Sequence, residues 1–263
     1  MIEHHYSDLQ IREIFHLEFL RYLGRKLKSD LYALKGGVNL RLFFNSIRYS
    51  EDMDLDVRTI EVHALKDCVM DILKMPAFRE NLKPFGIREI ISPAIERAKQ
   101  TETTQRFKIH LISSGGVDLF TKIEFSRRGM AGGMVVQTPA EPLLRAYKIA
   151  PVLIPHYDIR QAVIQKIKAL AGRSAIQARD IFDLYLLNSQ YAPHKAENPI
   201  SVEKKVFLKA YENVFEVEFE VFRDTVVAYL LPEDQLVYND PSSWEEVRLK
   251  AAGFVKQLEK EYA

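Results

Sequence analysis

Hydrophobic residues near the start of the chain recur at helical spacing. Between Leu9 and Leu27 they return every three to five residues, with charged side chains in the intervals. This periodicity predicts an amphipathic helix over residues 8–28. A short apolar run at 31–34 follows and ends at a glycine pair, which predicts a strand, a tight turn and a further helix over 38–44.

Strand patterns dominate the next part of the chain. Residues 53–57 alternate apolar and acidic side chains, which is typical of a strand with one buried face. Further on, a glycine pair at 115–116 separates two apolar segments and indicates a hairpin. Together these patterns predict strands over 53–57, 86–91, 106–112 and 117–125, a helix over 62–75 and a loop over 126–133.

The pattern changes near residue 140, after which strand patterns are nearly absent. The segments with helical spacing are 141–149, 159–171, 178–188, 202–211, 217–229 and 244–262. Among them, 217–229 also alternates closely enough to fit a strand. The chain is therefore predicted to have an α+β fold, with an α/β domain over 1–140 and a helical domain over 141–263.

The composition is that of a globular protein, with 47% hydrophobic and 28% charged residues among 263. No stretch approaches the roughly 20 apolar residues that cross a bilayer, and the first residues lack the apolar segment of a signal peptide. Because Cys68 is the single cysteine, no intramolecular disulfide can form, and we expect a cytoplasmic protein without a membrane partner.

The net charge of +1 means that binding to nucleic acid would require a local basic patch. The basic residues between Arg145 and Arg179 are candidates for such a patch, and scattered surface charge is the alternative.

The acidic strand carries the clearest candidate chemistry. In a strand, Asp52, Asp54 and Asp56 would line one face, while the residues between them enter the core. Three adjacent carboxylates repel one another, so a bound cation would lower the cost of placing them together. Mg²⁺ prefers carboxylate oxygens, water and phosphates, and two such ions could activate an attacking hydroxyl and stabilise a leaving pyrophosphate. Taken alone, however, an Asp-x-Asp pattern is more often a solvated strand edge.

The pair Gly36-Gly37 lies between a predicted strand and a predicted helix. Backbone N–H groups at such a turn can approach an anion, and the helix N-terminus adds a partial positive charge. A lone glycine pair is usually only a turn. Combined with the acidic strand, it predicts a phosphate-binding turn beside a metal-binding strand, an arrangement that nucleotidyl transfer requires.

Two segments resemble a known protein family. The first includes Leu34-Lys35-Gly36-Gly37-Val38-Asn39 and Arg48-Tyr49-Ser50-Glu51-Asp52-Met53-Asp54, and the second includes Gln165-Lys166-Ile167-Lys168 and Arg179-Asp180-Ile181-Phe182-Asp183. Both resemble the AbiEii/AbiGii toxin family of the DNA polymerase β-like nucleotidyltransferase superfamily. The resemblance implies a mixed β-sheet flanked by helices, followed by a helical domain that contributes to the active-site cleft.

The resemblance also implies roles for individual residues. Asp52, Asp54 and a third carboxylate, for which Glu124 is the candidate, would be catalytic and hold Mg²⁺. Lys166 and Asp180 match later motifs of the family and are expected to be catalytic, with Lys166 binding a triphosphate. The residues expected to bind nucleotide are Gly36, Gly37, Asn39, Arg48, Ser50 and Lys166. The alternative for Glu124, Lys166 and Asp180 is an ordinary surface or helix-capping role.

The function implied by the resemblance is an Mg²⁺-dependent nucleotidyltransferase that moves a nucleotide from an NTP to an acceptor. The candidate acceptor is tRNA or another RNA, and the implied role is that of a toxin in a toxin–antitoxin or phage-defence system, with a cognate antitoxin as partner. Two alternatives stay open: a small-molecule or protein acceptor, and a nucleotide-binding module without catalysis. The second is motivated by Val38, which stands where the family often has a hydroxyl residue.

Overall fold

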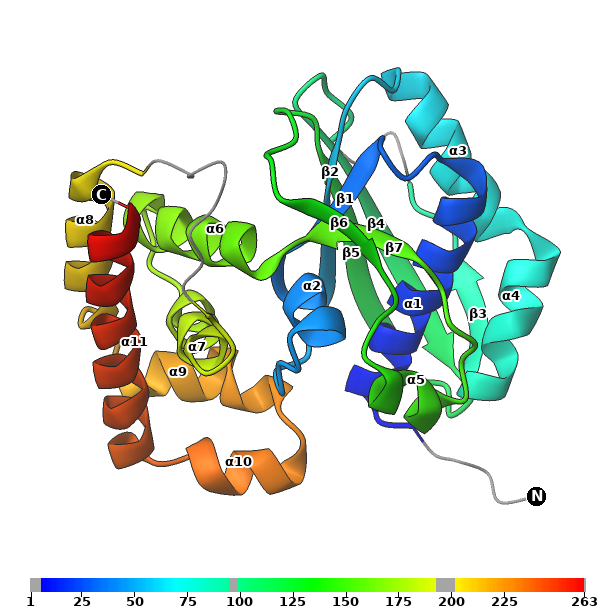
Figure 1. Cartoon of the computed structure of the whole chain (residues 1–263). Coiled ribbons are helices and arrows are strands. Elements are labelled where there is room, and N and C mark those ends of the chain that lie inside the picture. Colours follow the sequence, from blue (N-terminus) through cyan, green and yellow to red (C-terminus); the bar gives the residue numbers. More distant parts are fainter. Residues whose placement is uncertain (1–5, 95–98, 193–201, 263) are drawn as a thin grey trace. The chain divides into compact units, whose positions relative to one another are not determined.

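The structure, a computed structural model, describes residues 6–94, 99–192 and 202–262 (Figure 1). The chain forms two compact units. Residues 1–45 and 49–157 make up the first, which we name the sheet unit, and residues 46–48 and 158–263 make up the second, which we name the helical unit.

A mixed sheet forms the centre of the sheet unit. Its strands in the described residues are β1 (Tyr32–Lys35), β2 (Asp52–Val57), β3 (Ile87–Ile91), β4 (Thr104–Ser113), β5 (Asp118–Ser126), β6 (Met134–Gln137) and β7 (Ile154–Tyr157). They lie in the order β3-β4-β5-β2-β1-β7-β6. Strand β2 runs parallel to β5 and β1 parallel to β7, whereas the other neighbours are antiparallel. This order places β2, the acidic strand, in the middle of the sheet.

Helices cover one face of this sheet. The helices of the sheet unit are α1 (Asp8–Lys26), α2 (Gly36–Phe43), α3 (Val62–Lys74), α4 (Pro76–Leu82), the 3₁₀ helix η1 (Lys83–Phe85) and α5 (Glu141–Tyr147). Figure 1 shows α1, α3 and α4 along one side of the sheet, and their apolar residues join Met53, Leu55 and Val57 of β2 in one core. Because side chains alternate along a strand, the acidic residues of β2 lie on the opposite face.

The helical unit contains α6 (Ile159–Gly172), α7 (Ala178–Asn188), α8 (Lys204–Val214), α9 (Phe219–Thr225), the 3₁₀ helix η3 (Val227–Tyr229), α10 (Pro232–Tyr238) and α11 (Pro241–Tyr262). Trp244 of α11 is buried and stacks on Phe222 of α9 with ring centroids 4.2 Å apart. Its indole N–H donates to the carbonyl of Val217 at 3.0 Å. The polar edge of the ring is therefore satisfied inside an apolar core.

The mixed α+β fold predicted from the sequence is confirmed, with the predicted strands and most predicted helices in place. Two strands were not predicted, β6 and β7. All four residues of β7 are buried, so its segment lacks the alternation that marks a strand with one exposed face. Because these strands complete the sheet, the sheet unit extends to residue 157 rather than to the predicted 140.

Two short helices, α4 and α10, were also not predicted, and each begins with a proline at its first turn. The segment 217–229, which fits either a helix or a strand by its pattern, forms α9 and η3. Within the described residues, none of the helices combines the length and the hydropathy that spanning a membrane requires.

Candidate active site

The polar face of the sheet brings the acidic strand next to β5. In the register of this parallel pair, Asp52 lies opposite Lys122 and Asp54 opposite Glu124. All four residues belong to the set that alternates away from the apolar core. Glu124, predicted as the third carboxylate, is therefore the cross-strand neighbour of Asp54.

Basic side chains accompany these carboxylates. The Lys122 Nζ atom lies 2.9 Å from Asp52 Oδ2, and the guanidinium of Arg106 lies 2.7 Å from Glu124 Oε2. Since opposite charges lower the cost of crowding, these pairs allow a row of carboxylates to exist on one face.

Asp56, the third acidic residue of the strand, has a different environment. It is nearly buried, with Lys35 Nζ at 2.5 Å from its Oδ1 and the Tyr157 hydroxyl donating to its Oδ2 at 2.8 Å. Of the three aspartates predicted to share this face, Asp56 is therefore the one held in the interior, by Lys35 of β1 and Tyr157 of β7.

Asp54 lies in surroundings that disfavour its charged form. Burial raises its pKa above the usual value, and the charges of Glu124 and Asp52 act in the same direction, against Lys35 and Lys122. A cation placed beside Asp54 would reverse this effect, because opposite charge favours the ionised form.

The donor chemistry of this face suits Mg²⁺, which takes carboxylate oxygens as ligands. Asp52, Asp54 and Glu124 supply such oxygens from adjacent strands. Within the described part of the chain, however, no three acidic, histidine or cysteine side chains converge in the manner of a formed metal site. Asp52 and Glu124 are instead directed to Lys122 and Arg106.

The glycine turn lies against the same carboxylates. Gly36 opens α2 directly after β1 and has a φ of 70°, a left-handed conformation that favours glycine. A Cβ atom at this position would lie 3.1 Å from Asp54 Oδ2. The turn is thus a glycine turn for two reasons, its backbone conformation and its contact with Asp54.

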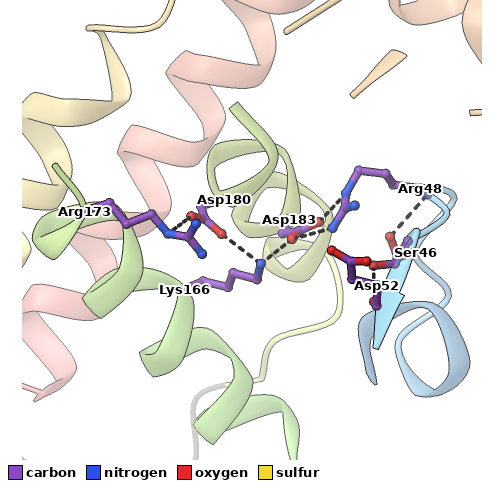
Figure 2. A network of polar contacts seen from close by, with 8 residues as sticks. Ser46, Arg48, Asp52, Lys166, Arg173, Asp180 and Asp183 are labelled. Atoms are coloured by element: carbon purple, nitrogen blue, oxygen red, sulfur yellow. Dashed lines mark hydrogen bonds and ion pairs between the residues drawn. The ribbon is translucent and has the colours of Figure 1, made fainter. Parts of the chain in front are cut away.

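A second polar cluster lies in the helical unit, where α6 meets α7 (Figure 2). Lys166 Nζ lies 2.9 Å from Asp180 Oδ1 and 2.5 Å from Asp183 Oδ2. Arg48 donates two hydrogen bonds to Asp183, at 3.0 and 2.9 Å, and Arg173 Nε lies 3.0 Å from Asp180 Oδ2. We name these five residues the buried ion-pair network.

Burial decides the electrostatics of this network. Both aspartates are fully buried, and Arg48 and Lys166 are nearly so. Burial acts to lower the pKa of Lys166, but the charges of Asp180 and Asp183 outweigh it and raise that pKa. Burial acts to raise the pKa of Asp183, but Arg48 and Lys166 outweigh it and lower that pKa. Lys166 and Asp183 are thus kept ionised by their partners.

The sequence from residue 18 to residue 262 matches the family described as nucleotidyl transferase AbiEii toxin, type IV toxin–antitoxin system. The chain belongs to this family. It is accordingly a nucleotidyltransferase of the AbiEii toxin family, as the resemblance of its two motif segments implied. No curated protein matches the chain in sequence.

Solved structures share the fold of this AbiEii-family chain. A proposed nucleotidyltransferase from H. pylori is 18% identical with a TM-score of 0.62, the match covering 98% of this chain and 97% of that one. JHP933 from Helicobacter pylori is 18% identical with a TM-score of 0.55, covering 98% and 94%. MenT4, a nucleotidyltransferase toxin from Mycobacterium tuberculosis H37Rv, is 17% identical with a TM-score of 0.57, covering 97% and 87%.

The remaining predicted nucleotide-binding residues of this nucleotidyltransferase differ in how accessible they are. Ser50 donates its hydroxyl to the carbonyl of Asp52 at 2.8 Å, which steadies the start of β2. Asn39 is fully buried, and its amide donates to the carbonyl of Tyr157 at 3.0 Å. Arg48 is committed to Asp183. The geometry therefore favours structural roles for these three side chains, and their contact with nucleotide stays a prediction.

Several residues that organise the site were not predicted from the sequence. Lys35 directly precedes the glycine pair, and Lys122 precedes Glu124 by two positions, so alternation along a strand could have pointed to both. Arg106 could have been found only through the pairing of β4 with β5. Tyr157, which holds Asp56, gives no local signal because it lies 101 residues away in the sequence.

Replacing Gly36 with alanine should disturb both the fold and the site. We expect a loss of stability of about 1–2 kcal/mol from the left-handed backbone, and a fall in kcat of roughly tenfold or more because the added methyl displaces Asp54. Gly132→Ala is the matched control, since its φ is not left-handed and a Cβ there meets nothing within 4 Å. Equal kcat and equal unfolding midpoints for both variants and the parent would show that the turn has no such constraint.

Two buried histidines should make the sheet unit sensitive to acid. Burial lowers the pKa of His16 and of His156 from 6.5 to about 4, and in both cases it outweighs groups that act the other way. His16 Nε2 lies 2.8 Å from the Thr121 hydroxyl oxygen, which donates its own hydrogen to the Glu51 carbonyl. The imidazole is therefore a neutral Nε2–H donor.

Because the folded-state pKa values are depressed, the unfolded chain binds more protons between pH 4 and 6.5. The contribution of the neutral histidines to the free energy of unfolding is complete above pH 6.5 and is lost as the pH falls toward 4. By pH 5 the loss is roughly 2 kcal/mol per histidine. Denaturant unfolding of the parent and of His16→Gln at pH 7 and pH 5 measures this. The variant, whose amide can still donate to Thr121, should lose less stability than the parent, and identical losses would contradict the assignment.

Proposed function

We propose that this AbiEii-family nucleotidyltransferase uses Mg²⁺ to transfer a nucleotide from an NTP to an RNA hydroxyl, with tRNA as the first acceptor to test. We also propose that it acts as the toxin of a toxin–antitoxin pair. The observation that carries the enzymatic proposal is the meeting of three features on one sheet face. Asp52 and Asp54 lie on β2, Glu124 lies opposite Asp54 on β5, and Gly36 lies against Asp54.

The proposed chemistry assigns a task to each feature. Asp52, Asp54 and Glu124 would hold Mg²⁺, which neutralises phosphate charge and polarises the attacked phosphorus. On binding the metal, Asp52 would give up its ion pair with Lys122, and Glu124 would give up its ion pair with Arg106.

The backbone N–H groups at the start of α2 would bind the phosphates of the NTP. The acceptor hydroxyl would lose its proton to solvent and its oxygen would bond to the α-phosphorus, while the bond from that phosphorus to the bridging oxygen breaks and pyrophosphate leaves.

A label-transfer assay tests the proposal. The protein is incubated with each of the four α-³²P-labelled NTPs, Mg²⁺ and total tRNA, and the products are separated into RNA, protein and small molecules. Label in RNA that disappears when EDTA is added is the expected result. Label found only in protein or in a small product would reassign the acceptor, and NTP binding without transfer to any acceptor would favour a binding module without catalysis.

The toxin role has its own test. Expression of the parent protein in bacteria should arrest growth, and co-expression of the gene that neighbours its own should restore it if that gene encodes the antitoxin. Growth arrest that persists in a variant with no label-transfer activity would separate toxicity from nucleotidyl transfer and would contradict the proposed link between them.

A further inference from the structure

The polar face of the sheet is arranged in rows that run across β4, β5 and β2. One row contains Arg106, Glu124 and Asp54, and the next contains Lys108, Lys122 and Asp52. A third row consists of Ile91 on β3, His110 on β4 and Phe120 on β5. Two residues along a strand separate successive rows, a distance of ~6.6 Å. The third row, which we name the aromatic row, thus lies next to the row of Asp52 and two rows from Glu124.

The aromatic row is exposed. Phe120 is 61% exposed, an unusual state for a phenylalanine in the middle of a strand, and its ring stacks on His110 with centroids 4.6 Å apart. Asp118 Oδ1 lies 2.6 Å from His110 Nε2, which holds the imidazole in place. His110 on β4 and Phe120 on β5 therefore form a flat aromatic surface that is fixed by the sheet, with Asp118 at its edge.

A pocket of about 440 Å³ opens over this surface. Its walls include Phe120 and His110 from the aromatic row and Lys108, Lys122 and Asp52 from the next row. The volume falls within the range of pockets that hold small ligands. Lys108 is exposed and makes no ion pair with any described residue, so it offers a free positive charge beside the aromatic surface.

The sheet order decides which substrate this pocket suits. The glycine turn follows β1, on one side of β2, whereas the pocket lies over β3, β4 and β5 on the other side. Asp52 and Asp54 lie on β2, the strand between β1 and β5, and Asp52 also lines the pocket. In a nucleotidyl transfer the attacking and leaving oxygens lie roughly in line through the phosphorus. If the triphosphate binds at the glycine turn, the acceptor must approach from the side of the pocket.

We propose that this pocket binds the acceptor, and that the Phe120–His110 surface stacks an unpaired nucleobase at the end of an RNA strand while Lys108 contacts its phosphate. Every base offers a flat face to an aromatic ring, so stacking selects for an unpaired base without reading its identity. The row spacing then leaves the ribose of the stacked nucleotide near Asp52. This inference rests on the proposed transfer to RNA and identifies the part of the sheet unit that selects the acceptor.

The test is direct binding, measured with the full chain by fluorescence anisotropy. The probes are a labelled RNA hairpin with a few unpaired 3′ nucleotides and the same hairpin with a blunt end. We expect Phe120→Ala to raise the Kd for the first probe about tenfold, and Phe120→Trp to keep it within about twofold of the parent. Lys108→Gln should reduce the slope of log K against log salt by about 0.7. Leu153→Ala removes another exposed side chain, 65% exposed and outside the pocket, and should change nothing.

Three results would overturn the proposal. The first is equal binding of the overhang probe by Phe120→Ala and the parent, and the second is equal affinity of the parent for the two hairpins. The third is weaker binding of NTP, rather than of RNA, by Phe120→Ala, which would make the pocket a nucleotide site.

The label-transfer assay on the same proteins separates this inference from the proposed function. If the parent transfers label to RNA and Phe120→Ala binds RNA as tightly as the parent, only the assignment of the pocket is wrong. If the parent binds the overhang through Phe120 but transfers no label, only the proposed catalytic activity is wrong.

Discussion

Replacing Asp54 with asparagine will lower nucleotide transfer by on the order of 100- to 1,000-fold and leave the protein at least as stable as the parent. The loss of activity follows from the position of Asp54, which contacts the glycine turn and faces Glu124 across the β2–β5 pair. The retained stability follows from its pKa, which burial and neighbouring carboxylates raise. A raised pKa means that the folded protein disfavours the charge, so a neutral side chain of the same shape relieves that cost.

The measurement combines the label-transfer assay with denaturant unfolding. Asp52→Asn should also lose transfer, whereas Asp67→Asn, an exposed aspartate on α3 with a 64% exposed side chain, is the matched control and should behave as the parent does. If Asp54→Asn labels RNA as rapidly as the parent, the carboxylates are not the site of the reaction. If it unfolds at clearly lower denaturant than the parent, Asp54 has a structural role and its loss of activity proves nothing about chemistry.

Replacing Asp183 with asparagine will destabilise the helical unit by about 3–5 kcal/mol. Asp183 is fully buried and accepts contacts from both Arg48 and Lys166. Its neutralisation removes the negative charge that faces both Arg48 and Lys166, and removing one member of a buried ion pair costs several kcal/mol. Trp244 is the single tryptophan of the chain and is buried in the helical unit, so its fluorescence follows the unfolding of that unit.

Glu246→Gln on α11 is the control for this change. It removes one carboxylate charge from an exposed ion pair with Lys250, and it should shift stability by no more than about 0.5 kcal/mol. An unfolding midpoint of Asp183→Asn equal to that of Glu246→Gln would show that the network does not hold the helices together.

Lys166 belongs to the same network and is also predicted to be catalytic. In Lys166→Met, Arg48 still faces Asp183 and Arg173 still faces Asp180, so we expect a milder loss of stability than in Asp183→Asn. Lys168→Met, an exposed lysine on the same helix, is the control. A folded Lys166→Met protein that transfers nucleotide at the parental rate would leave Lys166 with a structural role only.

The local pattern of residue types was sufficient to predict the features that depend on neighbours in the sequence. The alternation around Asp52 and Asp54 predicted a strand with one acidic face, because side chains two residues apart share a face in any strand. Gly36-Gly37 between an apolar run and a helical run predicted the turn, because only a few residue types tolerate its backbone conformation. Glu124 was a candidate because the family resemblance implied a third carboxylate on a later strand.

Pairing between distant segments decided the rest. The register of β2 with β5 is what places Glu124 opposite Asp54, and it also supplies Lys122 to Asp52. Arg48 meets Asp183 across 135 positions in the sequence, and the pocket joins residues from β2, β3, β4 and β5. Ion pairs and pockets depend on which strands and helices become neighbours, and burial of apolar surface over the whole chain determines that choice. The sequence by itself therefore determined where the acidic face and the glycine turn lie, whereas only the tertiary structure decided which charges neutralise them and what surface lies beside them.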